Sequence, residues 1–460
     1  MNDRHPNKRF AVVTLGCRVN QCESDSLAQQ FKDGGWTEAG AGAPVELVIV
    51  NTCAVTGKAA MQSRQAVRRA RRDHPGARLV VTGCYAQIAA GEIRKIKGVD
   101  TVCGNPEKHR LAALIRAGET LRISDVGRRH RFDPIQVPVA TDRTRPVLKI
   151  QDGCNAFCTY CIVPHARGRS RSMPEADVLD HIRRLEAAGF CEVVLSGIHL
   201  GAYGADLDPE TCLQRLLERI EAETVIDRVR LSSIEPAELT PGIRRLAAAS
   251  TRICPHFHVP LQSGDDDILR KMGRPYTSSQ FEALVVDLHR RMPDAAVGAD
   301  LLVGFPGETE ASFARTFALI ERLPFTYLHV FPFSARPGTP AFHFSDPVPS
   351  AQIQQRCRSL RRLGSQKRAR FLESLVNRRV SALVEARRDP KRGWLKATTA
   401  NYATVLLEGP DALKNRMVSC IIQQRVDDQS VFAQITDPTA ASAENTRSSK
   451  WMKPNRSKKA

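Results

Sequence analysis

Short apolar runs separated by helix-like stretches begin the chain. The first three runs, continuous as in strands covered on both faces, are FAVVTL (10–15), VELVIV (45–50) and ARLVVTG (77–83). Segments with helical periodicity lie between them, over 23–34 and about 58–72. This strand–helix alternation predicts a parallel α/β sheet, which we assign to a first domain over residues 8–125.

A second α/β region follows a stretch at 119–146 that is rich in Asp, Arg, Pro and Thr and reads as a linker. Its expected strands are 147–150, 191–197, 229–234, 256–261, 296–307 and 326–334. Helices are expected between them, near 174–189, 211–222, 265–272, 277–292 and 309–322. Six such repeats predict a partial β/α barrel over 145–372, and barrels of this kind carry their site at the carboxyl ends of the strands.

The end of the chain has a different pattern. A charged helix around 351–376 leads to short alternating runs with Gly and Asn between them, which predict a small antiparallel β-barrel over 373–437. The polar tail 438–460 cannot bury a core, and we expect it to be disordered. The expected fold class is therefore α/β in the first two units, with a β-barrel after them.

Charge indicates the kind of partner. The chain has 460 residues with 68 Lys and Arg against 49 Asp and Glu, a formal net charge of +19, which favours nucleic acid ahead of an anionic membrane surface. No run of about 18 apolar residues predicts a membrane span. The apolar stretch at 11–15 is shorter than the roughly 7–15 residues of a signal peptide. We expect a cytoplasmic protein without a membrane partner.

Thirteen cysteines are many for such a protein, in which disulfides are rare and metal ligation is the leading use of the thiols. Cys17, Cys53 and Cys84 each follow one of the first three strands. Because the carboxyl ends of parallel strands share one edge of a sheet, these three thiols are expected to converge.

A second trio, Cys154, Cys158 and Cys161, is spaced C-x3-C-x2-C directly after the strand at 147–150. Three thiolates on one short loop can hold three irons of a 4Fe–4S cluster and leave the fourth iron open. The alternative is a structural zinc site, which needs four protein ligands. The nearest fourth ligand, His165, lies behind a proline, so the cluster is favoured.

C-x3-C-x2-C at the head of a β/α barrel resembles the radical S-adenosylmethionine enzymes. The resemblance implies that S-adenosylmethionine chelates the open iron and is cleaved to a 5′-deoxyadenosyl radical. The motifs TLGCRVNQCES, VNTCAVTGKA and VTGCYAQ narrow the match to the methylthiotransferases, whose first domain holds an auxiliary 4Fe–4S cluster. Their last domain is the RNA-binding TRAM barrel, so the resemblance covers about residues 8–437.

Within that family, VNQ after the first ligand, SRQAVRRA at 63–70 and the loop at 154–172 most resemble the bacterial branch that modifies threonylcarbamoyladenosine at tRNA position 37. The resemblance implies methylthiolation of carbon 2 of that adenine, with one S-adenosylmethionine methylating a sulfur on the auxiliary cluster and a second supplying the radical. Cys22 stands where the branch usually has Tyr, and we interpret it as a bystander. The alternatives are isopentenyladenosine in tRNA, a ribosomal-protein aspartate, and a non-enzymatic iron–sulfur or RNA-binding scaffold.

Residues near strand ends resemble the family's S-adenosylmethionine pocket. Those assigned to it are Tyr160, Gly197, Ser232, Glu235 and Gln262. Gly197 and Ser232 also fit a purely structural role as turn residues. Further candidates that face the substrate are Asp300, residues 304–308, Phe331, Ser334 and Arg336.

Basic clusters fit contacts with RNA phosphates, although for any single Arg a solvated helix face is the commoner role. They are Arg64, Arg68, Arg69, Arg71 and Arg72, then Arg167, Arg169 and Arg171, the helix from Arg356 to Arg370, and Arg378 with Arg379. The expected partners are the tRNA anticodon stem-loop and an electron donor such as flavodoxin or ferredoxin. The protein is expected to act as a monomer.

Overall fold

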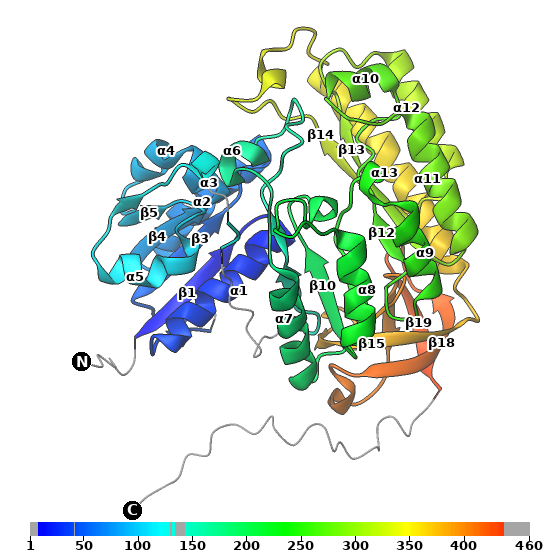
Figure 1. Cartoon of the computed structure of the whole chain (residues 1–460), viewed down its shortest axis with the longest axis horizontal. Coiled ribbons are helices and arrows are strands. Elements are labelled where there is room, and N and C mark those ends of the chain that lie inside the picture. Colours follow the sequence, from blue (N-terminus) through cyan, green and yellow to red (C-terminus); the bar gives the residue numbers. More distant parts are fainter. Residues whose placement is uncertain (1–7, 41, 129–130, 134–142, 437–460) are drawn as a thin grey trace, which may run out of the picture.

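A computed structural model describes residues 8–40, 42–128, 131–133 and 143–436. It consists of a parallel sheet, a central partial barrel and a closed C-terminal barrel. In Figure 1 the parallel sheet, blue to cyan, lies beside the green and yellow central barrel, and the orange C-terminal barrel lies at the lower end of the central strands. The predicted fold class is confirmed. The tail at 438–460 lies outside the described residues.

The N-terminal sheet has six parallel strands, with helices on both faces. In spatial order the strands are β2 (Thr37–Glu38), β1 (Arg9–Thr14), β3 (Leu47–Thr52), β4 (Arg78–Gly83), β5 (Thr101–Cys103) and β6 (Leu121–Arg122). The helices are α1 (Arg18–Asp33), α2 (Gly57–Asp73), α3 (Cys84–Ile88), α4 (Ala90–Arg94), η1 (Lys108–Arg110), α5 (Leu111–Arg116) and η2 (Val126–Arg128).

Strand β3 shows why this sheet needs cover on both faces. Leu47 and Ile49 pack in a core with α1 and α5, whereas Val48 and Val50 pack on the opposite face with α2 and α4. Successive side chains of a strand point to opposite faces, so an unbroken apolar run is stable only between two helix layers.

The central barrel has six parallel strands in two three-stranded groups. They are β7 (Val147–Lys149), β10 (Glu192–Ser196), β11 (Arg228–Leu231), β12 (His256–His258), β13 (Ala296–Val303) and β14 (Tyr327–Pro332). Single bridges Val229–Ile253 and Ser233–His258 connect the two groups. One apolar core with residues from both groups fills the space between the strands and the outer helices.

The outer layer is built from helices that alternate with these strands. They are α7 (Glu175–Ala187), η3 (Leu200–Ala202), α8 (Leu213–Glu223), η4 (Pro236–Glu238), α9 (Pro241–Ala249), α10 (Asp266–Lys271), α11 (Ser278–Arg291), α12 (Glu310–Arg322), η5 (Pro340–His343) and α13 (Ser350–Glu373). A short hairpin, β8 (Gln151–Asp152) with β9 (Arg171–Ser172), encloses the cysteine loop and α6 (Val163–Arg167).

The C-terminal barrel closes the lower end of the central strands. Its strands are β15 (Arg379–Arg388), β16 (Leu395–Thr399), β17 (Thr404–Leu407), β19 (Ser430–Ile435) and β18 (Met417–Arg425), with η6 (Asp411–Leu413) between β17 and β18 in sequence. Arg228, the first residue of β11, donates to the carbonyls of Thr398 and Ser381, and Tyr402 stacks on His256 at the start of β12. The expected all-antiparallel pattern is wrong at one pair, because β17 and β19 run parallel.

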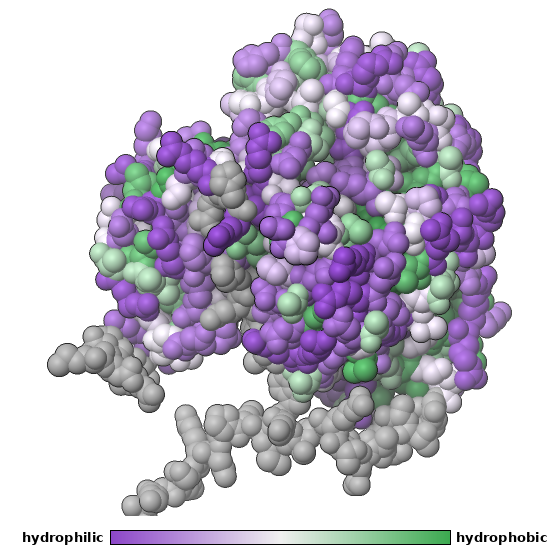
Figure 2. Space-filling model, viewed as in Figure 1, coloured by the Kyte–Doolittle hydropathy of each residue, from purple (hydrophilic) through white to green (hydrophobic). Residues whose placement is uncertain are grey.

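Most expected elements occur within a few residues of their predicted limits. The sequence patterns missed several elements that are short or weakly apolar, among them β2, β6, α4, α5 and α9. No helix among the described residues is both long and apolar enough to span a bilayer. The face shown in Figure 2 is mostly hydrophilic, with small apolar patches. The domain limits stay a prediction, since strand pairing does not show which part folds alone.

A buried ionic network joins the N-terminal sheet to the central barrel. Glu23 of α1 bonds Lys149 of β7 at 2.9 Å and Arg167 of α6 at 2.8 Å, and it also pairs with Lys108. Asp152 of β8 bonds Arg167 at 2.9 Å and Lys149 at 3.1 Å. Burial opposes ionisation of Glu23, but the three cations outweigh it and hold its pKa well below the usual range.

We predict that Glu23→Gln lowers the free energy of unfolding by about 3–5 kcal/mol, because it removes the charge that offsets buried cations. Glu38→Gln is the matched control. Its carboxylate pairs with Lys32 at the surface, where an exposed pair contributes about 0–1 kcal/mol. Urea denaturation of both variants measures the difference, and equal destabilisation would contradict a structural role for the network.

Candidate functional site

The first cysteine trio lies at one edge of the N-terminal sheet, as expected. Cys17 precedes α1, Cys53 follows β3, and Cys84 opens α3 directly after β4. Gly16 and Gly83, each with φ of +99°, turn the chain before Cys17 and Cys84. A Cβ added at Gly16 would lie 2.9 Å from Sγ of Cys53, so the loops carrying Cys17 and Cys53 are in direct contact.

Two polar side chains fix the backbone at this edge. Asn20 donates to the carbonyls of Leu15 and Thr52, which lie just before Cys17 and Cys53. The hydroxyl of Ser63 on α2 accepts from the Cys53 amide and donates to its carbonyl. Residues from the VNQ and SRQAVRRA motifs therefore hold the cysteine loops in place.

The three thiols oppose one another's ionisation. Burial, together with the nearby charges of Cys84 and Cys17, raises the pKa of Cys53 to about 11. Three close thiolates are stable only with cations between them, and irons of a cluster supply such charge. The donor set therefore fits an iron–sulfur cluster.

The second trio lies at the carboxyl ends of the barrel strands, within a ring of polar side chains. His199 contacts Sγ of Cys154 at 3.4 Å and pairs with Glu238 at 2.7 Å. Arg274 donates to Sγ of Cys158 at 3.3 Å and to Glu235. The ring thus takes groups from the segments that follow β7, β10, β11 and α10.

This ring places two cationic side chains beside the thiols, each paired with a carboxylate. Burial acts to lower the pKa of His199, but hydrogen bonds with Cys154 and Glu238 outweigh it and raise the pKa to about 10. Burial also raises the pKa of Cys161 to about 12. Thiolates at this loop would thus have an imidazolium and a guanidinium beside them. His199, Glu238 and Arg274 could not be predicted from the sequence, because their partners come from loops distant in the chain.

Hydrogen bonds connect the segments that carry the two trios. Asn105 donates to Sγ of Cys84 at 3.6 Å and to the carbonyl of Ala166 at 2.8 Å. Ala166 lies on α6, which begins just after Cys161. On another side, the Gly57 amide, four residues after Cys53, donates to Oγ of Ser334 beyond β14 at 2.9 Å. The two cysteine sites therefore share one junction.

The five residues assigned to the cofactor lie in different settings. Oγ of Ser232 is buried and has no hydrogen-bond partner among the described residues, which fits a group reserved for a ligand. Glu235 bonds Arg274, and Tyr160 packs edge-on against Phe305. The backbone N–H of Gln262 donates to the backbone carbonyl of Asp300. A Cβ at Gly197 would lie 2.8 Å from Oε1 of Gln151, so packing alone explains that glycine.

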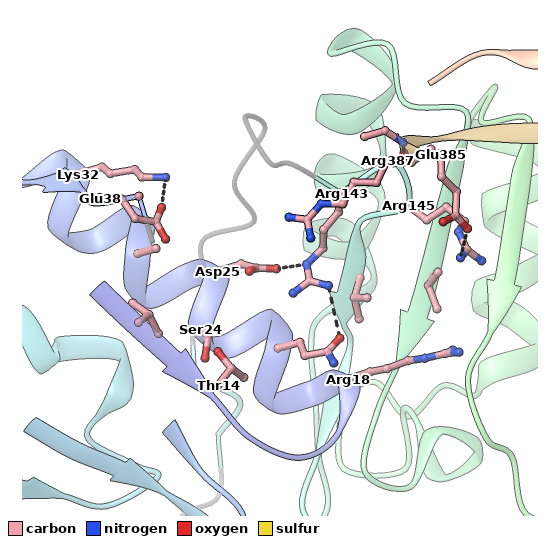
Figure 3. A pocket seen from close by; sticks show the side chains of 18 of the residues that line it. Thr14, Arg18, Ser24, Asp25, Lys32, Glu38, Arg143, Arg145, Glu385 and Arg387 are labelled. Atoms are coloured by element: carbon pink, nitrogen blue, oxygen red, sulfur yellow. Dashed lines mark hydrogen bonds and ion pairs between the residues drawn. The ribbon is translucent and has the colours of Figure 1, made fainter. Parts of the chain in front are cut away.

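A cleft of about 1090 Å³ lies between α1, the inner face of the central barrel and β15 (Figure 3). Its charged lining residues are the basic Arg18, Lys32, Arg143, Arg145, Arg230 and Arg387, and the acidic Asp25, Glu38 and Glu385. Each acid pairs with one of the cations. The surplus is positive, so the cleft favours a polyanion.

Several arginines predicted to contact RNA are instead structural. Arg167 and Arg171 are 2% and 4% exposed and belong to the buried network around Asp152, so they cannot reach a phosphate. Arg71 bonds the carbonyls of Gly98 and Ala77, and Arg356 and Arg368 are buried. Whether a basic residue contacts RNA or forms a buried ion pair can be decided only when its exposure is known.

Two cysteines outside both trios, Cys22 and Cys103, are buried in apolar cores. Cys22 is 2% exposed in the core between α1 and the barrel, and Cys103 is fully buried in the N-terminal sheet. Burial raises the pKa of each to about 12, so both stay protonated thiols.

Two family models match the chain. The uncharacterized protein family UPF0004 matches residues 9–104, and the radical SAM superfamily matches residues 148–320. The threonylcarbamoyladenosine tRNA methylthiotransferase MtaB of Bacillus subtilis is 35% identical over 89% of this chain and 92% of its own length. The protein of the same name from Aquifex aeolicus is 34% identical over 87% of this chain and 97% of its own length. A tRNA-2-methylthio-N(6)-dimethylallyladenosine synthase of Syntrophotalea carbinolica is 32% identical over 89% of this chain and 96% of its own length.

Solved structures show a similar fold. The radical S-adenosylmethionine methyltransferase TsrM of Kitasatospora setae, with cobalamin and a [4Fe-4S] cluster bound, superposes with a TM-score of 0.53. It is 17% identical, and the match covers 73% of this chain and 77% of that one.

Proposed function

The chain belongs to the radical-SAM methylthiotransferase family, and we propose that it methylthiolates carbon 2 of threonylcarbamoyladenosine at position 37 of tRNA. The observation that carries the proposal is the junction at Asn105, where one side chain bonds a thiol of the first trio and the helix that follows the second. A reaction that draws on two cysteine sites needs them beside one another.

Each trio has a separate role in this proposal. Cys154, Cys158 and Cys161 would hold the cluster that binds S-adenosylmethionine, and Cys17, Cys53 and Cys84 would hold the auxiliary cluster. When bound, these groups supply a carbon radical and a methylthio group, chemistry that side chains lack. The residues of this chain bind and orient them: Arg274 and His199 neutralise thiolates, and Ser232 offers a hydrogen bond.

Names of relatives support the substrate branch. Six relatives named as threonylcarbamoyladenosine enzymes are 34–37% identical, and two named as dimethylallyladenosine synthases are 31–32% identical. Mass spectrometry of tRNA nucleosides from a strain lacking the gene tests the branch. Loss of methylthio-threonylcarbamoyladenosine supports it, and loss of the isopentenyl species instead would overturn it.

A non-enzymatic scaffold is the candidate from another class. Reduced protein incubated with S-adenosylmethionine distinguishes it, because only an enzyme releases 5′-deoxyadenosine. An electron donor such as flavodoxin or ferredoxin, a monomeric state and a cytoplasmic location stay predictions.

We predict that Cys158→Ala abolishes formation of 5′-deoxyadenosine, whereas Cys53→Ala retains it but yields no methylthiolated tRNA. Each variant should carry about four irons, one cluster, instead of about eight. Cys254→Ala, in a buried cysteine outside both trios, is the control and should keep both clusters. Methylthiolated tRNA from the Cys53 variant would refute the auxiliary role.

We predict that Ser232→Ala leaves the free energy of unfolding unchanged, because its hydroxyl is already unpaired. Binding of S-adenosylmethionine should weaken by about two- to tenfold, equivalent to a net hydrogen bond of about 0.5–1.5 kcal/mol. Ser233→Ala, at the exposed neighbouring residue, is the control. Calorimetric titration of the cluster-loaded protein measures both, and unchanged affinity would exclude Ser232 from the pocket.

We predict that Arg387→Glu weakens tRNA binding and reduces the slope of log affinity against log salt by about 1, since an exposed cation of the cleft is lost. Arg245→Glu makes the same charge change on α9, in the outer helix layer. Filter binding over a salt series compares the two. An equal loss in both variants would indicate a general charge effect and not a binding cleft.

A further inference from the structure

Three potential metal ligands converge on the inner face of the central barrel, apart from both cysteine trios. They are His258 of β12, Asp300 of β13 and His329 of β14. The neighbours of these residues along each strand, Phe257, Leu301 and Val330, pack in the core under the outer helices. Because strand side chains alternate, the three ligands point the other way, toward the barrel interior.

Strand register places these side chains together. Asp300 pairs directly with His329, and His258 pairs with Gly298, two residues before Asp300. Nε2 of His258 lies 2.8 Å from Oδ1 of Asp300, and Nδ1 of His329 lies 3.3 Å from the same oxygen. All three ligand atoms lie within 4.8 Å of one another.

This geometry is close to that of a bound ion. Bonds of about 2.0–2.2 Å from zinc to nitrogen or oxygen keep two ligand atoms within about 4.4 Å of each other. The distances from Oδ1 of Asp300 to Nε2 of His258 and to Nδ1 of His329 satisfy this limit. The third distance, between the ligand nitrogens of His258 and His329, needs at most a small rotation of His329, whose side chain is 54% exposed.

A hydrogen bond behind the ligands orients one imidazole. Nδ1 of His258 lies 3.1 Å from the hydroxyl of Tyr327, and that hydroxyl lies 2.8 Å from Nε2 of His256. At that distance the Tyr327 hydroxyl can donate its proton to Nε2 of His256. Tyr327 can then accept from Nδ1–H of His258, which leaves the Nε2 lone pair for a metal. A ligating histidine commonly donates its other ring N–H in this way.

We propose that His258, Asp300 and His329 bind a divalent first-row transition metal ion. Imidazole and carboxylate together suit Zn²⁺ and Fe²⁺. Three protein ligands leave at least one coordination position open, as in metal sites that bind a further ligand. His329 is the most exposed of the three side chains, so a further ligand can reach the ion from its side. This site is independent of the proposed methylthiolation.

The test is titration with Zn²⁺ in competition with a zinc-sensitive dye. It uses protein loaded with about eight irons, so that both cysteine trios are occupied. We expect one tight equivalent in the natural protein. His329→Ala and Asp300→Asn should each weaken it by more than about 100-fold, because loss of an outer-shell partner alone costs about 10–100-fold.

Two further variants separate a metal site from a network of hydrogen bonds. Tyr327→Phe keeps the ring and removes only the hydroxyl behind His258, so affinity for Zn²⁺ should fall by about tenfold. His289→Ala, at an exposed position on α11, should leave it unchanged. Absence of a tight equivalent in the natural protein, or equal affinity in the His329, Asp300 and His289 variants, would overturn the proposal.

Discussion

The carboxylate of Glu23 is the constraint on which the arrangement of the two cysteine sites depends. It lies on the helix that begins after Cys17, and its partners Lys149 and Arg167 lie on the strand before and the helix after the second trio. A charge buried to this extent tolerates little displacement, because any lost partner leaves another charge without compensation. Two sheets from distant parts of the chain are thereby fixed in one relative position.

Sequence patterns predicted the sheets and the cysteine loops, because both depend on local order along the chain. Apolar runs predicted β3 and β4, and the fixed spacing of Cys154, Cys158 and Cys161 indicated one loop. They did not predict partners across the junction. The sequence predicted that Arg167 contacts RNA, but its side chain is buried against Glu23, which lies 144 residues earlier in the chain. The residues next to an arginine in the sequence do not show whether a carboxylate from another part of the chain will pair with it.

The C-terminal barrel packs against the central barrel and contributes to its structure. Arg230 bonds Glu192 at 2.7 Å and donates to carbonyls in the turn after β16, while Tyr402 stacks on His256 at a centroid distance of 4.3 Å. Arg18, next to Cys17, donates to the hydroxyl of Tyr402. Tyr402 therefore connects the lower end of the central barrel to the start of α1, next to the first cysteine site.

The buried network also has an excess of positive charge, with direct consequences for the first trio. Its cations are Lys108, Lys149, Arg167 and Arg171, and its acids are Glu23 and Asp152. The guanidinium of Arg167 is stabilised by charge on Cys84, which raises its pKa although burial opposes this. In a low-dielectric setting such an excess must be offset nearby. Burial raises the pKa of Cys17 and Cys53, and the positive charge of Arg167 acts against that rise, so a charge that connects the two sheets reduces the cost of ionising thiols at their border.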